Sequence, residues 1–215
     1  MPARRSRSAN EYRRREPVRE PYDVVLIVCE GEKTEPKYFK ELRAAHSLSN
    51  ANVIVAPPEH GNDPLSIARY AEHQLERSSD YNRVYCVFDR NGHATYAAAL
   101  QKIKDSPHGK SGHLIAIPSV PCFEVWVLLH YEYTSAPFNA VGGKSSCDQV
   151  IKKVMGHCYK YHKGFAGVFE ELVDRTDAAV TYAKRLETHN RETNSENPAT
   201  DVHHLVTYLR GLRSP

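Results

Sequence analysis

Three acidic residues, each in or just after an apolar run, could together bind a hard divalent cation. Glu30 follows the aliphatic run 24–28, Asp89 follows the strand-like run 83–88, and Glu124 lies within the apolar segment 118–130. Such runs are typical of buried parallel elements, whose carboxyl ends meet at one edge of a sheet. Magnesium takes oxygen ligands from one or two protein carboxylates and keeps positions for water and phosphate. Each acid alone could instead cap a turn or a helix.

Together, these acids predict metal-dependent hydrolysis of a phosphodiester bond, with Mg²⁺ or alternatively Mn²⁺ as the cofactor. We expect Asp89 to be the principal metal ligand and Glu30 to be a second ligand or the general base. Glu124 would complete the ligand set, directly or through water. Asn91 could add a carbonyl oxygen but no negative charge, so it is the weakest ligand candidate.

Other residues near these acids could take part in the same chemistry. Lys33 could stabilise charge on the phosphate in the transition state, or it could face solvent at a helix start. His93 could orient a phosphate or protonate a leaving group, although a structural role fits equally well. Glu35 could reach the site, or it could stabilise the dipole of the helix in which it lies. Thr34 is predicted to cap that helix after a tight turn at Gly31.

The order of elements predicts an α/β fold, with a mainly parallel sheet and helices on both of its faces. Strands are expected at 22–29, 53–56, 83–88 and 114–117, and helices at 35–45, 63–77 and 94–104. A buried helix should begin near Pro121 and place Glu124 about one turn inside it. Further helices are expected at 147–158, 168–187 and 200–212, with a polar break at 190–198. We therefore expect one domain over 21–215, with an α/β core at about 21–133 and a helical extension at about 134–215.

The positive charge of the chain is concentrated at its start. Residues 1–20 contain seven arginines and three glutamates, whereas the whole chain has a net charge of only +3. This segment is predicted to be a disordered basic arm, and it could bind nucleic acid through its phosphates. The arginines proposed for this contact are Arg4, Arg5, Arg7, Arg13, Arg14 and Arg15. The segment 159–163 alternates aromatic and basic residues, so Lys160 and Lys163 could also contact phosphates, unless it is simply a surface helix end.

The cysteines and the hydropathy of the chain predict a cytoplasmic protein that does not enter a membrane. Five scattered cysteines fit reduced thiols better than a disulfide framework. No apolar stretch is long enough for a membrane span, and the arginine-rich start does not resemble a secretory signal. Cys147, His157, Cys158 and His162 offer zinc ligands, but they lack the tight paired spacing of structural zinc sites.

Four segments carry a resemblance to a known family. They read IVCEGEKTEPKYF, VFDRNGH, PSVPCFEVWVLLH and NPATDVHHLVTYL, and they resemble the RloB family, small proteins with a Toprim-like nuclease fold in prokaryotic anti-phage defence. The resemblance runs from about residue 22 to residue 209. It implies a Toprim-type site, in which a glutamate follows the first strand and an Asp-x-Asp motif follows a later one. Here Asn91 stands where the second aspartate would be.

The resemblance also implies a biological role, and three functions remain open. The leading prediction is an endonuclease acting on RNA, including tRNA, or on DNA as a defence effector, with an ATPase partner. The second is an inactive nucleic-acid-binding module or regulatory partner of an ATPase, which the amide at Asn91 would favour. The third is a phosphohydrolase acting on small phosphoesters. The sequence does not decide between a monomer and a homo-oligomer.

Overall fold

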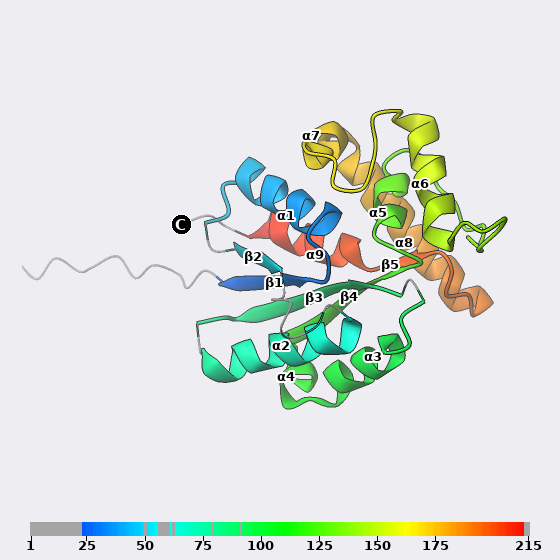
Figure 1. The fold of residues 1–215 in the computed structure, drawn as a ribbon. Coiled ribbons are helices and arrows are strands. Elements are labelled where there is room, and N and C mark those ends of the chain that lie inside the picture. The colour runs from blue at the N-terminus through cyan, green and yellow to red at the C-terminus, as the bar shows by residue number, and fades with distance from the viewer. Residues whose placement is uncertain are drawn as a thin grey trace, which may run out of the picture.

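A five-stranded sheet forms the centre of the computed structural model, which describes residues 23–49, 51–55, 61, 63–78, 80–90 and 92–212. The strands lie in the order β2-β1-β3-β4-β5 (Figure 1). β1 to β4 pair in parallel, whereas the short β5 is antiparallel to β4. The strand bounds are β1 (Val25–Cys29), β2 (Ala51–Val55), β3 (Arg83–Asp89), β4 (Leu114–Val120) and β5 (Ala199–Thr200).

Helices cover both faces of the sheet and form most of the second half of the described chain. α2, α3 and α4 lie on one face, and α1 and α9 lie on the other (Figure 1). The helices are α1 (Thr34–Ala45), α2 (Pro64–Arg77), α3 (Tyr96–Asp105), α4 (Pro107–Lys110), α5 (Glu124–Leu129), α6 (Ser146–His157), α7 (Val168–Leu172), α8 (Thr176–Thr193) and α9 (Val202–Gly211). The predicted α/β class is therefore confirmed, with a mainly parallel sheet, helices on both faces and a helical C-terminal part.

The uninterrupted aliphatic sequence of β1 follows from its position between two layers of helices. All five of its residues are buried. Val25, Ile27 and Cys29 belong to the larger hydrophobic core, which includes residues of α1, α5 and α9. Leu26 and Val28 belong to a second core with residues of α2 and α3. Because side chains alternate between the faces of a strand, both faces of β1 must be apolar.

Local hydrogen bonds explain where α2 and α6 begin. The Asp63 side chain accepts hydrogen bonds from the backbone N–H groups of Leu65 and Ser66, and Pro64 occupies the first turn of α2. Ser145 and Asp148 form a reciprocal capping box at the start of α6. α1 differs from the prediction, because it begins at Thr34 and this side chain does not cap it.

The predicted start of the helix around Glu124 was wrong. β4 continues to Val120, because Ser119 pairs with β3 on one side and with β5 on the other. α5 begins only at Glu124, so this acid lies at the first helical residue and not one turn inside. The consequence is that the Glu124 carboxyl lies close to the strand ends.

Two further features of the second half also differ from the prediction. The expected helix 168–187 is divided into α7, a 3₁₀ turn at Val173–Arg175, and α8. α8 then continues to Thr193, into the predicted polar break, and ends at Asn194, whose backbone is left-handed. The two-residue strand β5 was not expected at all, since such a short pairing leaves no periodic pattern.

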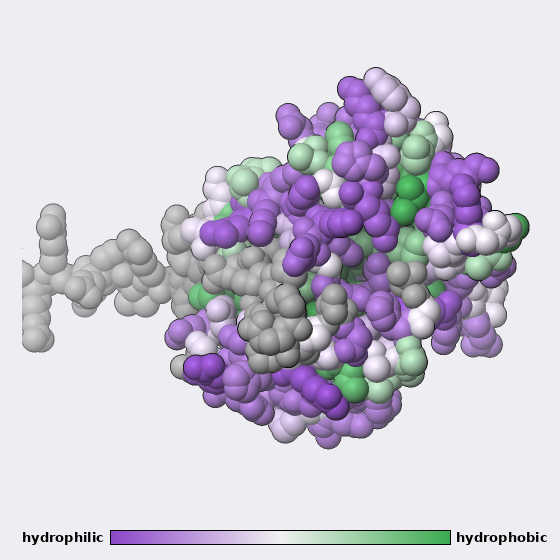
Figure 2. Space-filling view, viewed as in Figure 1, coloured by the Kyte–Doolittle hydropathy of each residue, from purple (hydrophilic) through white to green (hydrophobic). Residues whose placement is uncertain are grey.

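The described residues present a largely polar surface. On the face shown in Figure 2, hydrophobic residues form small areas separated by hydrophilic ones. Within the described ranges, no helix has both the length and the apolar character needed to cross a membrane. All five cysteines are buried and free. This agrees with the prediction of reduced thiols.

Candidate metal centre at the strand ends

Four carboxylates converge where the parallel strands end. Glu30 directly follows β1, Asp89 is the last residue of β3, and Glu124 is the first residue of α5. Glu35 joins them from the first turn of α1. β1 and β3 are direct neighbours in the sheet, with Cys29 opposite Val87, and this register brings the first two acids together. The structure therefore brings the three predicted acids together, and Glu35 reaches them, as one of its two interpretations expected.

Glu30 connects the two strand ends and holds a histidine. Its backbone N–H donates to Val87 O at 3.1 Å, and its Oε2 accepts from the backbone N–H of Asp89 at 3.0 Å. Its other oxygen, Oε1, lies 2.8 Å from His93 Nε2. The His93 side chain is 34% exposed, so the imidazole is held by Glu30 yet remains accessible to a substrate.

Asp89 and Glu124 each have a buried carboxylate oxygen that accepts no hydrogen bond from the described residues. Asp89 is 8% exposed and Glu124 is 1% exposed. Among the described residues, Asp89 Oδ1 and Glu124 Oε2 have no hydrogen-bond partner. A buried carboxylate oxygen without a partner carries a large desolvation cost, which a bound cation removes. Two such oxygens beside two more carboxylates fit the donor set of Mg²⁺ or Mn²⁺.

The electrostatics of the cluster agree with its geometry. Burial raises the pKa of Asp89 well above its usual range, and the neighbouring carboxylates of Glu35, Glu124 and Glu30 raise it further. Burial, together with the charges of Glu124 and Glu30, raises the pKa of Glu35 to about 7. The pKa of Glu30 is also raised by burial, although the Asp89 N–H and His93 oppose this effect. Like charges that share a desolvated site disfavour ionisation, and a divalent cation would reverse that preference.

Two neutral hydroxyl groups fix the remaining oxygen of Glu124. The hydroxyls of Thr34 and Tyr161 donate to Glu124 Oε1 at 3.4 Å and 3.3 Å. Thr34 also accepts from the backbone N–H of Gly164 at 3.2 Å, so one side chain joins α1, α5 and the segment after α6. Sequence reasoning missed both roles. Both interpretations of the segment 159–163 placed it at the surface, but Tyr161 is buried with its hydroxyl toward Glu124.

Lys163 forms an ion pair with the acid cluster. Its Nζ lies 3.9 Å from Glu124 Oε2, and the side chain is 41% exposed. Partial burial opposes its charge, but Glu124, Cys122 and Asp89 raise the pKa of Lys163 above its ordinary value. The residue was predicted to contact phosphates from a surface segment. The structure places it at the edge of the acid cluster, where it can still meet a phosphate bound there.

The other candidate residues make no contact with these acids or lie outside the described part of the chain. Lys33 is exposed at the start of α1, and its side chain has no hydrogen bond or ion pair with any described residue. Lys160 is exposed and lies over the ring of Tyr159, which is 81% exposed. His130, which directly follows α5, is buried against Trp126. Asn91 lies outside the described residues, as do all the proposed arginines, Arg4, Arg5, Arg7, Arg13, Arg14 and Arg15.

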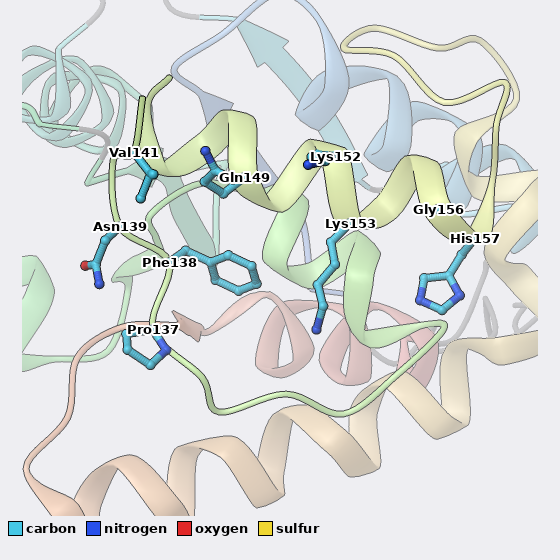
Figure 3. Close-up of a pocket in the computed structure, with 9 residues that line it drawn as sticks. All are labelled: Pro137, Phe138, Asn139, Val141, Gln149, Lys152, Lys153, Gly156 and His157. Atoms are coloured by element: carbon cyan, nitrogen blue, oxygen red, sulfur yellow. The ribbon is translucent and has the colours of Figure 1, made fainter. Parts of the chain in front are cut away.

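A cavity of about 670 Å³ lies beside α6, and none of the four clustered acids lines it. Lys153 and His157 extend from α6 toward the loop that carries Pro137 and Phe138 (Figure 3). Phe138 also lines a second cavity of about 240 Å³, together with Arg90 and other residues near the end of β3. The two cavities share Phe138 and Asn139 as lining residues; one is lined by residues of α6 and the other by Arg90, the residue after Asp89.

This fold and site define an α/β protein with a buried cluster of four carboxylates at the ends of its parallel strands. The chain belongs to the RloB-like protein family, whose sequence model matches residues 25–209. The match covers the whole sheet and every described residue of the acid cluster. Searches of the curated proteins and of the solved structures each found no significant match.

Proposed function

We propose that this protein is a divalent-metal-dependent nuclease that hydrolyses phosphodiester bonds at the acid cluster. The observation that carries the proposal is the pair of buried carboxylate oxygens on Asp89 and Glu124 that accept no hydrogen bond from the described residues, beside Glu30 and Glu35. Asp89 and Glu124 would hold Mg²⁺ or Mn²⁺, with Glu30 or Glu35 completing the set. The ion would supply charge neutralisation on the phosphate and a lower pKa for the attacking water.

The chain itself supplies groups for proton transfer and for substrate charge. Glu30 Oε1 orients His93 through a contact of 2.8 Å, so the imidazole can pass a proton to the leaving oxygen. Lys163 can attract a phosphate oxygen toward the metal ligands, because it is close to Glu124 and still partly exposed. Thr34 and Tyr161 keep Glu124 in one orientation, which leaves its Oε2 facing the cluster.

The two cavities that share Phe138 supply a route for a polynucleotide strand. Their walls include Lys152 and Lys153 of α6, the Phe138 ring, and Arg90 next to Asp89. Phe138 is nearly buried, so this groove contributes mainly the charge of its basic side chains, which can contact the phosphates of a nucleic acid. Lys153 forms an ion pair with Glu132, so part of this charge is compensated in the unbound protein. This groove favours a nucleic acid over a small phosphoester as the substrate.

Family membership supports a role in anti-phage defence, which we include in the proposal. In that role the protein would be a toxic effector that cleaves RNA, including tRNA, or DNA. An ATPase partner would detect infection and release the activity. We also propose that the fold is Toprim-like and that the protein acts in the cytoplasm.

A second function, an inactive nucleic-acid-binding module, is favoured by one observation. The position two residues after Asp89 carries Asn91, an amide, where a Toprim-type site would carry a second aspartate. Glu35 supplies a fourth carboxylate in the described cluster, which compensates for the missing charge and supports the active nuclease. Asn91→Asp separates the two ideas, since a large gain of cleavage from an inactive parent would establish a degenerate site.

A cleavage assay tests the proposed function. Labelled tRNA, single-stranded RNA, duplex DNA and mononucleotides would each be incubated with the protein in Mg²⁺, Mn²⁺ or EDTA. Glu30→Gln should abolish metal-dependent cleavage, whereas Glu76→Gln, an exposed glutamate on α2, should not change it. Full activity in both Glu30→Gln and Asp89→Asn would refute the site. Turnover of mononucleotides alone, unaffected by deletion of residues 1–20, would identify a small-phosphoester phosphohydrolase instead.

A further inference from the structure

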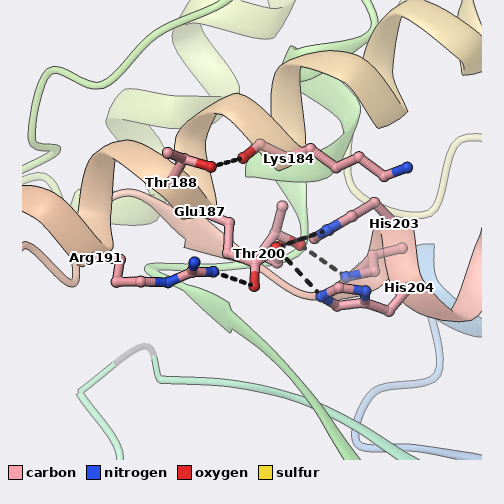
Figure 4. Close-up of polar contacts among 8 residues, drawn as sticks. Lys184, Glu187, Thr188, Arg191, Thr200, His203 and His204 are labelled. Carbon is pink, nitrogen blue, oxygen red and sulfur yellow. Dashed lines mark hydrogen bonds and ion pairs between the residues drawn. The ribbon is translucent and has the colours of Figure 1, made fainter.

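A second group of metal-binding side chains lies between α8 and α9, separate from the acid cluster. Glu187 on α8 faces His203 and His204 in the first turn of α9 (Figure 4). One ligand atom from each residue lies within 4.8 Å of the other two. β5 immediately precedes α9, and β4 separates β5 from β3 in the sheet. The group therefore lies on the far side of β4 from the strand that ends in Asp89.

The distances within this group fit a metal site better than they fit hydrogen bonds. Glu187 Oε2 lies 3.3 Å from His203 Nε2 and 3.4 Å from His204 Nε2. A charge-assisted hydrogen bond between such atoms is shorter, at about 2.7–2.9 Å. Zinc bonds to nitrogen and oxygen are about 2.0–2.2 Å, so two ligands at tetrahedral angles are about 3.3–3.5 Å apart. The two separations between Glu187 and the histidines correspond to two edges of such a tetrahedron, and the two histidine nitrogens lie within 4.8 Å of each other.

The hydrogen bonding of His203 provides an independent reason for a cation. Its Nδ1 lies 3.2 Å from the carbonyl oxygen of Thr200, and its Nε2 faces the Glu187 carboxylate. A neutral imidazole has one N–H, so one of its nitrogens must direct a lone pair at an oxygen. The His203 side chain has no solvent exposure, and burial disfavours the doubly protonated imidazolium. A cation between Nε2 and Oε2 removes the conflict, while Nδ1–H donates to Thr200 as in many metal-bound histidines.

The surroundings leave the group accessible and support the carboxylate. His204 is 54% exposed, so a metal can enter from solvent. Arg191 contacts the other carboxylate oxygen, Glu187 Oε1, at 3.4 Å, which leaves Oε2 for a ligand (Figure 4). Glu187 also lines a cavity of about 250 Å³, which can supply water for a fourth coordination position.

We propose that Glu187, His203 and His204 form a binding site for Zn²⁺ or a similar borderline divalent cation. Two imidazoles and one carboxylate suit zinc, whereas the all-oxygen acid cluster suits magnesium. The bound ion would join α8 to the start of α9 and hold β5 against β4. The cysteines and histidines at 147–162 form no such group among the described residues.

Cobalt binding in excess Mg²⁺ tests this site without depending on nuclease activity. Untagged, EDTA-treated protein would be titrated with Co²⁺, whose tetrahedral complexes absorb strongly in the visible range, while Mg²⁺ occupies the acid cluster. Wild type should bind a single equivalent that Zn²⁺ displaces, and Zn²⁺ should raise its melting temperature. His189→Ala, which removes another histidine from α8, should behave like wild type.

Glu187→Gln and His204→Ala should weaken cobalt binding at least tenfold and abolish the rise in melting temperature. His203 is avoided because its replacement within the core could prevent folding. Unchanged binding in both variants would overturn the proposal, as would a wild type that binds no Co²⁺ or Zn²⁺. A near-ultraviolet thiolate-to-cobalt band would also overturn it, because that band would locate the ion at a cysteine.

Discussion

Removing the negative charge of Glu35 should stabilise the metal-free protein at neutral and alkaline pH. Glu35 lies in the acid cluster, where burial and the charges of Glu124 and Glu30 raise its pKa from 4.5 to about 7. Glu35→Gln keeps nearly the same shape and removes the charge. Asp89, whose pKa is raised by the same neighbours, should become easier to ionise in this variant.

The size of the effect follows from the pKa difference between the folded and unfolded states. Above pH 7 the carboxyl is charged in both states, and the buried charge destabilises the fold. Below pH 4.5 it is protonated in both states, and the penalty is absent. The destabilisation therefore grows as pH rises from about 4.5 to 7, the reverse of ordinary acid denaturation. At about 1.36 kcal/mol per pKa unit, a shift of about 2.5 units gives a maximum of roughly 3 kcal/mol.

Urea unfolding in EDTA measures this prediction. The free energy of unfolding of Glu35→Gln should exceed that of wild type by roughly 2–3 kcal/mol at pH 8, and the difference should vanish near pH 4.5. Comparing variant with wild type cancels the titration of the groups that do not interact with Glu35. Glu76→Gln is the matched control and should not differ from wild type at either pH. Saturating Mg²⁺ should reduce or reverse the advantage of Glu35→Gln.

One result would refute the reasoning. If Glu35→Gln is no more stable than wild type at pH 8 in EDTA, the carboxylates do not repel one another as described. The interpretation of the cluster as a site prepared for a cation would then lose its electrostatic support.

Three further predictions concern single side chains around the site. Tyr161→Phe removes a hydroxyl donor to Glu124 and should lower the free energy of unfolding, measured in urea, by about 1–3 kcal/mol. An unchanged midpoint of urea unfolding would show that this hydrogen bond does not stabilise the fold. Lys163→Met should weaken binding of single-stranded RNA in a filter-binding assay. It should also reduce the slope of the logarithm of the binding constant against the logarithm of the salt concentration by about one unit. A slope equal to that of wild type would exclude a phosphate contact by Lys163. Asp63→Ala removes the cap of α2 and should cost about 1–2 kcal/mol at pH 7. Because hydrogen bonds lower the pKa of Asp63 to about 2, this contribution should persist to pH 4 and fade only as pH falls toward 2; loss already at pH 5 would contradict it.

The sequence was sufficient to predict the fold and the three principal acids, because their signals are local. The aliphatic β1 sequence and the alternation of strands with helices are direct consequences of burial in a layered sheet. Glu30 and Asp89 could be placed because the end of a hydrophobic run marks the end of a strand. A resemblance in four short segments pointed to the family that the match over residues 25–209 then showed.

Contacts between segments that are far apart in the chain were not predictable in the same way. Tyr161 lies 37 residues from Glu124, and its aromatic character fits a surface or a core equally well. The boundary of α5 depends on β5, a pairing of two residues about 80 positions later, so a local pattern could not define it. The pairing of Glu187 with His203 likewise requires α8 and α9 to pack together.

Binding of Mn²⁺ tests the central claim, that the acid cluster is a divalent-metal site, most directly. Mn²⁺ is observed by electron paramagnetic resonance, and a Glu187→Gln background removes the second proposed site. Protein with an intact acid cluster should bind Mn²⁺ in competition with Mg²⁺, and Asp89→Asn should lower the affinity at least tenfold while the fold is retained. Equal Mn²⁺ affinity with and without the Asp89 carboxylate would contradict the account.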